Sequence, residues 1–313
     1  MNCFIVSNTD IYYNLALEEF LLKESSKDFF FLWRSEPVVV VGKHQNPYKE
    51  INLAYAQEKG IKIARRLSGG GTVFQDLGNI NFTLIKNTEE GKQINFKKHS
   101  MLIFEALKAL RLNVEYSERN DLIIEKRKFS GNAEHVFKNR VLHHGTILFD
   151  TDLLCLNAVL KNQYSKYQDK TIPSVKSTVV NLESYLSGID ILSFQRKILN
   201  KVLENNGFVE IEPPFNNRVE HLFLEKYKTE EWIFGYTPRY IFKNNFRFDG
   251  VLCSLKMEVL KGKITQFEIT GLDSEIEQII KRQVLGEKHL WGNIKMKLSN
   301  LPIQYKELYK RFF

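Results

Sequence analysis

The sequence has few cysteines, and their spacing gives them no shared role. The three cysteines, Cys3, Cys155 and Cys253, are odd in number, far apart and set in apolar surroundings. Such an arrangement predicts neither a disulfide framework nor a cysteine-based metal cluster. We therefore expect the chain to work in a reducing compartment, and we predict a cytoplasmic location.

Long hydrophobic runs are also missing. The longest apolar runs, Phe29 to Trp33 and Val38 to Val41, are far shorter than the roughly 20 residues that a membrane-spanning helix needs. The first residues, MNCFIVSNTD, have neither the basic start of a signal peptide nor the arginine- and serine-rich character of a transit peptide. The sequence thus predicts no membrane partner.

Charge of one sign is not concentrated in any part of the chain. Lys+Arg 45 against Asp+Glu 37 gives a formal net charge of +8 without a long basic block. This balance favours acidic partners, and an acidic protein substrate fits it as well as nucleic acid does. Because a basic stripe is the usual mark of nucleic-acid binding, we expect no nucleic-acid partner.

Short apolar runs alternate with amphipathic stretches through most of the chain, a pattern typical of an α/β fold. Strands are expected at 3–6, 29–33, 38–41, 121–125 and 141–149, and helices at 11–23 and 97–112. The runs at 29–33 and 38–41 read as neighbouring buried strands. The polar stretch 161–177 has little periodicity and is expected to be a surface loop that moves or becomes ordered on binding.

Near residue 240 the sequence changes from helical patterns to an aromatic, proline-containing passage, EEWIFGYTPRY. Two alternating segments flank Lys261-Gly262-Lys263, which is a hairpin signal. Helices are expected to follow at 274–285 and 302–312. We therefore predict a first domain of residues 1–241 and a small α+β domain of residues 242–313.

Three consecutive glycines occur in the segment from Arg65 to Asn79, RRLSGGGTVFQDLGN. Glycine lets main-chain N–H groups approach an anion closely, and Arg65 and Arg66 can pair with phosphate oxygens bidentately. An ordinary glycine turn between strands is the alternative. The segment is flanked by strand patterns and lacks a Lys-Ser/Thr pair, so it is not the loop of nucleoside triphosphatases.

A second cluster of polar residues lies between positions 120 and 146. Lys128 precedes a Ser-Gly pair, and its ammonium group could stabilise charge on a phosphate and a carboxylate in one transition state. Alone, it would be an ordinary surface lysine. Asn120 and Asp121 offer an amide for a base edge and a carboxylate for magnesium, although such a pair is often only a turn.

These segments together resemble the lipoate-protein ligases and the related lipoyltransferases. The glycine segment, the NDL of Asn120 to Leu122, KFSGNA and HHGTILF occur in the order and spacing of that family. NLALEEFLL, FLWRSEPVVVVGKHQNP and SVKSTVVNL are also similar to it. The resemblance implies a catalytic domain shared with biotin-protein ligases and class II synthetases, with mixed sheets flanked by helices.

The resemblance also implies a reaction in two halves. Lipoate is first joined to the α-phosphate of ATP with Mg²⁺, and the acyl group of lipoyl-AMP then passes to a lysine of an acceptor protein. The implied acceptors are acidic lipoyl domains of 2-oxoacid dehydrogenase E2 subunits or the glycine-cleavage H protein. The reaction needs a metal, main-chain donors and one or two cations, and no protein nucleophile.

Site residues follow from the positions of the family motifs. The implied contacts of ATP and the acyl-adenylate are Arg66, Ser68, Gly69, Gly70, Gly71, Thr72, Val73, Phe74, Asn79, Asn120, Asp121 and Lys128. The implied contacts of lipoate are Leu15, Trp33, Gly71, Lys128, Ala133 and His143. Lys128 is the catalytic residue, and Asp121 is the candidate Mg²⁺ ligand. Because His143 and His144 are adjacent on a strand, they should point to opposite faces, which argues against joint metal binding.

One departure from the family leaves alternatives open. Glu134-His135 stands where bacterial ligases usually carry a basic residue, and this difference puts the use of ATP in question. Asn120 favours the use of ATP, because an amide that faces adenine helps to select it. A transferase that accepts preformed lipoyl-AMP is one alternative. An octanoyltransferase with Cys155 as its nucleophile, a biotin ligase and a non-catalytic lipoate or nucleotide sensor are others. The intact lysine and glycine motifs favour the full ligase.

Overall fold

The computed structural model describes residues 1–89, 94–160, 163–186, 188–214 and 216–313. The chain divides into two compact units. Unit 1 comprises Met1–Lys43, Lys62–Asn157 and Val175–Lys228, and unit 2 comprises His44–Ile61, Ala158–Ser174 and Thr229–Phe313. The predicted domain boundary after residue 241 stays a prediction. No helix in the described residues combines the length and apolar character needed to cross a bilayer.

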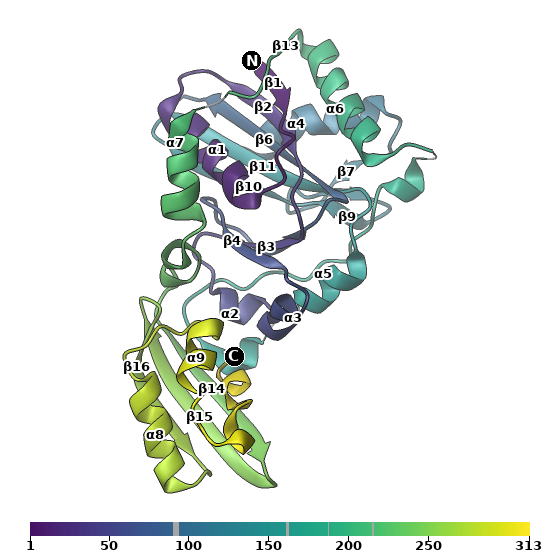
Figure 1. Cartoon of the computed structure of the whole chain (residues 1–313). Coiled ribbons are helices and arrows are strands. Elements are labelled where there is room, and N and C mark those ends of the chain that lie inside the picture. The colour runs from purple at the N-terminus through teal and green to yellow at the C-terminus, as the bar shows by residue number, and fades with distance from the viewer. Residues whose placement is uncertain (90–93, 161–162, 187, 215) are drawn as a thin grey trace. The chain divides into compact units, whose positions relative to one another are not determined.

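A mixed sheet of six strands forms the centre of unit 1 (Figure 1). In spatial order its strands are β10 (Asn132–Phe137), β11 (Arg140–Leu148), β6 (Asn79–Asn87), β2 (Phe29–Trp33), β1 (Asn2–Ile5) and β13 (Val209–Glu210). The pairs β2–β1 and β1–β13 are parallel, and the other pairs are antiparallel. This architecture confirms the predicted α/β class.

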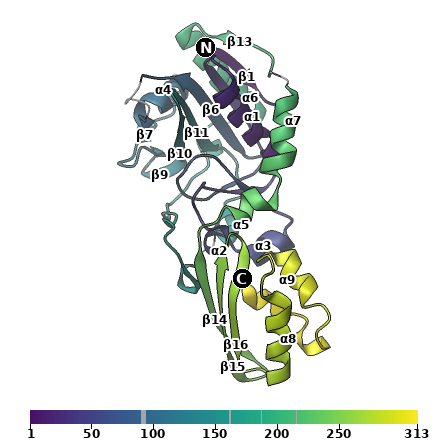
Figure 2. The same ribbon diagram turned by 90° about the vertical axis from the view of Figure 1, so that its left-hand side faces the viewer.

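Helices cover both faces of this sheet (Figures 1 and 2). One face packs against α4 (Phe96–Ala109) and α6 (Ile191–Asn206), and the other against α1 (Ile11–Glu24), which also contacts α7 (Asn217–Leu222). Asp10 caps α1 as predicted, because its side chain accepts hydrogen bonds from two main-chain N–H groups of the first turn. The core between the sheet, α4 and α6 is apolar.

Two three-stranded sheets complete unit 1. Their strands in spatial order are β4 (Lys62–Arg65), β3 (Val38–Val41) and β5 (Val73–Gln75), then β7 (Glu115–Tyr116), β8 (Leu122–Ile124) and β9 (Arg127–Ser130). The expectation that 29–33 and 38–41 are neighbours was wrong, since β2 and β3 belong to different sheets. Both are fully buried, and burial alone does not identify the pairing partner.

Unit 2 contains a four-stranded antiparallel sheet. Its strands are β12 (Tyr167–Gln168), β14 (Tyr240–Phe248), β15 (Val251–Leu260) and β16 (Lys263–Thr270), and its helices are α2 (Pro47–Glu50), α3 (Leu53–Glu58), α8 (Ser274–Val284) and α9 (Trp291–Lys297). The β15–β16 hairpin was predicted correctly, with Lys261 and Gly262 at positive φ in its turn. The remaining helix, α5 (Leu153–Val159), lies at the passage from unit 1 to unit 2.

Three expectations for the later part of the chain need correction. The stretch 161–177 is not only a loop, because it contains a short 3-10 turn and β12, while residues 161–162 lie outside the described residues. The helix expected at 302–312 is two 3-10 segments, Ile303–Tyr305 and Leu308–Phe312. Helix α9 was not anticipated. The 3-10 turn is Tyr164–Lys166, a further one lies at Glu183–Tyr185, and short π-helical segments lie at Phe223–Tyr227 and Glu231–Gly235.

Candidate functional site

The triple-glycine segment is a loop that joins β4 to β5, so it has the strand-loop-strand setting that the sequence predicted. Gly70 adopts a φ of +85°, a backbone conformation that other residues rarely reach. Gly70 and Gly71 are exposed, whereas Ser68 and Thr72 on either side are buried. The loop is therefore anchored at both ends and presents its glycine main chain to solvent.

Two buried arginines lie at the start of this loop, and one of them, Arg66, holds it in shape. Arg66 donates hydrogen bonds to the main-chain oxygens of Gly69 and Gly71, both at 2.7 Å, and to Ser68 Oγ at 3.0 Å. Burial lowers the pKa of Arg66 to about 10, so it remains charged near neutral pH. Arg65 donates to main-chain oxygens that follow β3. The structure thus gives Arg66 a loop-shaping role, while Arg65 binds the segment after β3. Direct phosphate contact by Arg66 stays a prediction.

A chain of buried hydrogen bonds connects the loop to the central sheet. The Ser68 hydroxyl lies 2.6 Å from His144 Nε2, and His144 Nδ1 lies 3.0 Å from both carboxylate oxygens of Glu18 on α1. Thr83 donates to Glu18 at 2.6 Å and accepts a hydrogen bond from the Trp33 indole at 2.9 Å. The network fixes the start of the loop against three strands and a helix, and sequence analysis found only part of it.

We expect His144→Ala to destabilise unit 1, because it leaves the Ser68 hydroxyl and the Glu18 carboxylate buried with fewer partners. The expected loss in the free energy of unfolding is about 1–3 kcal/mol. Urea denaturation followed by tryptophan fluorescence measures it. His221→Ala removes an exposed histidine of α7 and is the matched control. Equal stability of the two variants would contradict the role of the network.

Lys128 and the glycine loop approach the same short stretch of chain, from Gly131 to Ala133, where β10 begins. The Lys128 ammonium lies 3.0 Å from Asp121 Oδ1, and a Cβ built on Gly131 would lie 3.0 Å from the ammonium nitrogen. A Cβ built on Gly70 would lie 3.8 Å from the Ala133 side chain. Residues two apart in an extended strand share one face. The lysine and the loop therefore flank Gly131 and Ala133 from two directions.

The main chain around Lys128 is held by a segment far away in the sequence. Its N–H donates to the Thr178 oxygen at 2.9 Å, and its oxygen accepts from the Val180 N–H at 3.0 Å. Asn132 Nδ2 donates to the main-chain oxygen of Asn120 at 3.1 Å, and Asn120 has a φ of +62°. These contacts bring the predicted Asn120-Asp121 pair, Lys128 and the start of β10 together.

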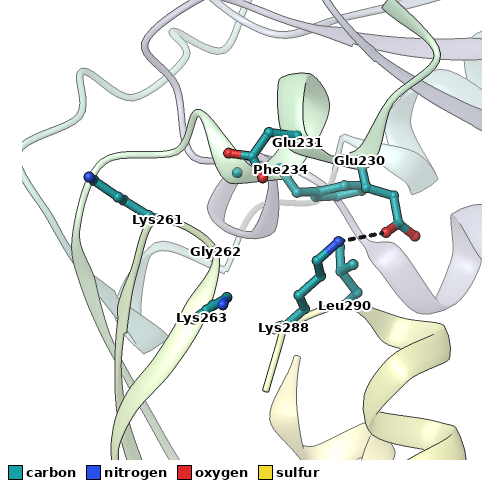
Figure 3. A pocket seen from close by; sticks show the side chains of 9 residues that line it. Glu230, Glu231, Phe234, Lys261, Gly262, Lys263, Lys288 and Leu290 are labelled. Carbon is teal, nitrogen blue, oxygen red and sulfur yellow. Dashed lines mark ion pairs between the residues drawn. The ribbon is translucent and has the colours of Figure 1, made fainter. Parts of the chain in front are cut away.

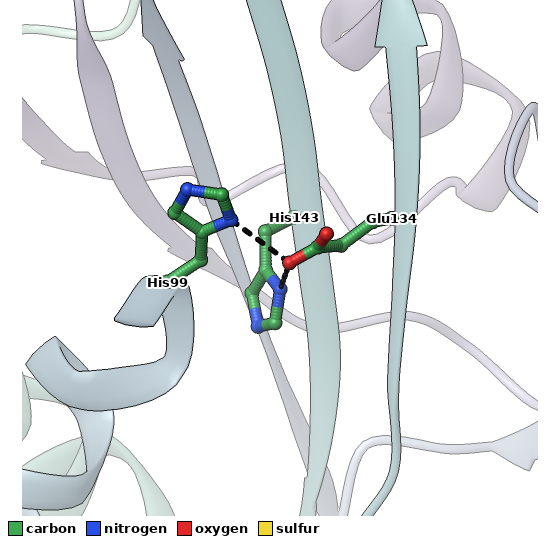
Figure 4. A group of neighbouring side chains, drawn as sticks. All are labelled: His99, Glu134 and His143. Carbon is green, nitrogen blue, oxygen red and sulfur yellow. Dashed lines mark hydrogen bonds and ion pairs between the residues drawn. The ribbon is translucent and has the colours of Figure 1, made fainter. Parts of the chain in front are cut away.

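His143 and His144 point to opposite faces of the sheet, as the strand periodicity predicted. His144 is paired with Ala133 across the β10–β11 hairpin and faces the loop. His143 is paired with Glu134 and lies on the α4 side, where Glu134 also contacts His99 (Figure 4). The assignment of His143 to the lipoate pocket therefore does not match its position, because the histidine on the loop face is His144.

The Glu134-His135 departure has a structural explanation. Glu134 points toward α4, so its carboxylate does not face the loop. His135 shares the strand face of Ala133 and is half-buried. Burial, together with the nearby Lys43 and Lys23 ammonium groups, lowers the pKa of His135 to about 4. Lys43 is a cation of this face that sequence analysis missed, and its N–H donates to the Ser68 oxygen at the loop entrance.

The other predicted site residues are mostly buried. Leu15 of α1 and Trp33 at the end of β2 are 3% and 2% exposed. Phe74 of β5 is buried and Val73 is half-buried. Asn79 begins β6, where its amide donates to Asn81 at 3.0 Å. The lipoate contacts of Leu15 and Trp33 and the nucleotide contacts of Val73, Phe74 and Asn79 stay predictions.

Two of the three cysteines, Cys3 and Cys253, are buried thiols. Burial raises the pKa of Cys3 to about 11 and also raises that of Cys253, and a thiol rather than a thiolate is a poor nucleophile. Cys155 is half-buried on α5. The raised pKa values thus rule out Cys3 and Cys253 as activated nucleophiles, and the octanoyltransferase alternative with Cys155 stays open.

Unit 2 has a separate, small charged hollow of about 30 Å³ (Figure 3). Its lining residues are Glu230, Glu231, Phe234, Gly235, Lys261, Gly262, Lys263, Lys288 and Leu290. Lys288 pairs with Glu230 at 3.7 Å across it. All nine residues belong to unit 2, and none of them was predicted as part of the site.

Comparison with known proteins places this arrangement in a family. Residues 10–203 match the lipoyl protein ligase A/B catalytic domain. The lipoate-protein ligase LplJ of Bacillus subtilis is 32% identical over 308 residues, which cover 90% of this chain and 93% of that protein.

Solved structures agree with this match. A crystal structure of lipoate-protein ligase A bound with ATP is 24% identical, covers 75% of this chain and 100% of its own, and has a TM-score of 0.64, which shows the shared fold. A bipartite lipoate protein ligase of Thermoplasma acidophilum, studied with its E2 lipoyl domain, is 25% identical over 75% of this chain and 96% of its own, with a TM-score of 0.64. On these grounds the chain belongs to the lipoate-protein ligase family.

Proposed function

We propose that this ligase makes lipoyl-AMP from lipoate and ATP and then transfers the lipoyl group to a lysine of an acceptor domain, with Lys128 as its catalytic residue. The observation that carries the proposal is the approach of Lys128 and the glycine loop to one short stretch of chain, from Gly131 to Ala133 at the start of β10. An ammonium and a set of main-chain donors on two sides of one short strand segment suit a mixed anhydride of phosphate and carboxylate.

In the first half-reaction, a lipoate carboxylate oxygen attacks the α-phosphorus of ATP, and the bond to pyrophosphate breaks. The Lys128 ammonium balances the charge on the phosphate and the carboxylate, which otherwise repel each other. The exposed main chain of Gly70 and Gly71 supplies N–H donors to the phosphate. Buried Arg66 keeps these donors in position through its hydrogen bonds to the loop.

In the second half-reaction, the neutral amine of the acceptor lysine attacks the carbonyl carbon of lipoyl-AMP. The bond to the phosphate oxygen breaks, so that AMP leaves, and the proton that the amine loses passes to water. Lys128 keeps its proton and stabilises the oxyanion and the departing phosphate. The apolar lipoyl tail would lie along the face that carries Leu15, Trp33, Ala133 and His144, all of which are buried in unit 1. His144 replaces His143 in this proposal.

Asp121 is the residue whose chemistry suits Mg²⁺. Its carboxylate is 19% exposed, and one of its oxygens pairs with Lys128, which leaves the other available for a cation that is otherwise bound by phosphate oxygens. Mg²⁺ would there neutralise charge on the triphosphate. Asp121 also positions the Lys128 ammonium beside Gly131, so its carboxylate has a role even when no metal is bound.

The acceptors proposed for this ligase are acidic lipoyl domains, as in E2 subunits or the glycine-cleavage H protein. The solved archaeal relative, studied with its E2 lipoyl domain, and the net charge of +8 support this choice. We expect the transfer rate to fall by about tenfold from low to high salt, because screening weakens electrostatic attraction. Rates measured with synthetic lipoyl-AMP and an acidic apo domain test this, and a flat salt profile would contradict it.

The function itself is tested by incubating the purified chain with ATP, Mg²⁺, lipoate and an apo lipoyl domain and measuring the mass of the domain. We expect one lipoyl group to be added, with pyrophosphate released. Supplying synthetic lipoyl-AMP without ATP separates the two half-reactions. Modification with lipoyl-AMP alone would show a transferase, and no modification in either reaction would contradict the proposal.

A further inference from the structure

Three metal-ligating side chains meet on the face of the central sheet that α4 covers (Figure 4). His99 comes from α4, Glu134 from β10 and His143 from β11. The Nδ1 atoms of the two histidines lie 2.8 Å and 2.9 Å from the same carboxylate oxygen of Glu134. One ligand atom from each residue lies within 4.8 Å of those from the other two.

We propose that His99, Glu134 and His143 form a binding site for one divalent transition-metal ion, with Zn²⁺ as the preferred ion. Two imidazoles and one carboxylate are a known three-residue ligand set for Zn²⁺, which leaves a fourth position for water. Imidazole ligands disfavour Mg²⁺ and Ca²⁺, which select oxygen. The site lies outside the proposed acyl-adenylate chemistry, because its three side chains point to the opposite face of the sheet from His144.

The geometry needs little change to accept the ion. Bonds of about 2.0–2.2 Å to nitrogen and oxygen in a tetrahedral site place ligand atoms about 3.4 Å apart. The two nitrogen–oxygen distances here would therefore widen by only about half an ångström. The two histidine nitrogens, which lie within 4.8 Å of each other, would also settle about 3.4 Å apart, through rotations of their side chains.

The surroundings of the three residues fit an enclosed site. Their side chains are 3%, 1% and 0% exposed. Phe82 and Phe96 lie close to the His143 ring, so the shell around the ligands is apolar. The second oxygen of Glu134 accepts the main-chain N–H of Asn95 at 3.0 Å, which orients the carboxylate as supporting contacts orient metal ligands.

Charge also favours a cation at this place. Within the described residues, the ion pairs of Glu134 are with the two histidines, and no lysine or arginine pairs with it. A buried carboxylate needs a compensating partner, and a divalent ion would serve as one. The ion could enter at the start of α4, where Asn95 is exposed one turn before His99. Bound there, it would tie α4 to the hairpin.

The test uses the full chain, without a histidine tag, stripped of metal and dialysed against Zn²⁺ alone and, separately, against Co²⁺. We expect one equivalent of metal per chain, a visible Co²⁺ spectrum typical of tetrahedral coordination, and a higher unfolding temperature with Zn²⁺. Glu134→Gln and His99→Gln should each weaken Zn²⁺ binding by at least about tenfold. Circular dichroism verifies that each variant is folded.

His221→Gln is the matched control, because His221 and Glu225 form a histidine–carboxylate pair on the surface at 2.8 Å. It should bind Zn²⁺ as the unmodified chain does. Failure of the unmodified chain to retain Zn²⁺, or equal affinity in a folded Glu134→Gln or His99→Gln variant, would overturn the proposal. In that case the three residues are a hydrogen-bonded core cluster. These readouts do not depend on ligase activity, so they are independent of the proposed function.

Discussion

Replacing Lys128 with alanine is expected to slow lipoyl-AMP formation by about a hundred- to a thousandfold, the loss that follows removal of one main stabiliser of transition-state charge. The reason is the position of the ammonium, which lies beside Gly131 and is held there by Asp121. The Lys128 side chain is 28% exposed, so its removal should have little effect on folding. Pyrophosphate release in the presence of lipoate and ATP measures the rate.

Lys197→Ala is the control for this prediction, since Lys197 is an exposed lysine of α6. It removes the same charge and should leave the rate unchanged. The transfer step should also slow in Lys128→Ala when synthetic lipoyl-AMP is supplied, because the same ammonium stabilises the departing phosphate. Near-normal pyrophosphate release by the folded variant would rule out the role of Lys128.

The second large effect is expected for Gly70→Val. A β-branched residue at a φ of +85° is strained by about 1–3 kcal/mol. Its Cβ would also lie 3.2 Å from Arg66 Nη2, which is tighter than an ordinary contact, so the loop and its anchor must move. We expect ATP-dependent lipoyl-AMP formation to fall at least about tenfold, with weaker ATP binding as the main cause.

Gly207→Val separates backbone strain from damage to the site. Gly207 ends α6 with a φ of +62°, and a Cβ there would have no neighbour within 4 Å. Both variants should lose similar stability from strain, and only Gly70→Val should lose ATP affinity. An unchanged ATP affinity in Gly70→Val, measured by calorimetry, would show that the loop does not contact phosphate.

Local features of the fold could be predicted from the sequence because local physics determines them. The cap at Asp10, the strand-loop-strand setting of the glycines and the β15–β16 hairpin depend on residues close together in the chain. Pairing between distant segments could not be predicted in this way. The separation of β2 from β3, and the addition of β12 to the sheet of unit 2, depend on contacts across the fold.

In the site, too, local features could be predicted and contacts between distant segments could not. The opposite faces of His143 and His144 follow from strand periodicity, but which face meets the loop depends on how β11 pairs in the sheet. The Glu134–His143 pair could have been found, since a two-residue turn at Lys138-Asn139 fixes the register of β10 and β11. The burial of His99 could also have been predicted, because His99 lies one turn before Ile103 on the apolar face of α4.

The contacts of the glycine loop could not be predicted from the sequence. Two adjacent arginines beside three glycines indicated phosphate pairing, but the structure shows Arg66 bound to the loop's own carbonyl groups. A guanidinium offers five donors to any acceptor that the fold brings near. The presence of an arginine in the sequence therefore does not reveal which acceptor it binds. The Ser68–His144–Glu18 connection likewise joins three segments that are far apart in the sequence.

The most direct measurement is a crystal structure of the chain with a non-hydrolysable analogue of lipoyl-AMP. We predict that the phosphate group of the analogue will accept hydrogen bonds from both Lys128 Nζ and a main-chain N–H of Gly70 or Gly71, with the lipoyl tail on the face that carries Ala133 and His144. A phosphate that contacts one of these two elements while the other lies beyond hydrogen-bond reach would contradict the account.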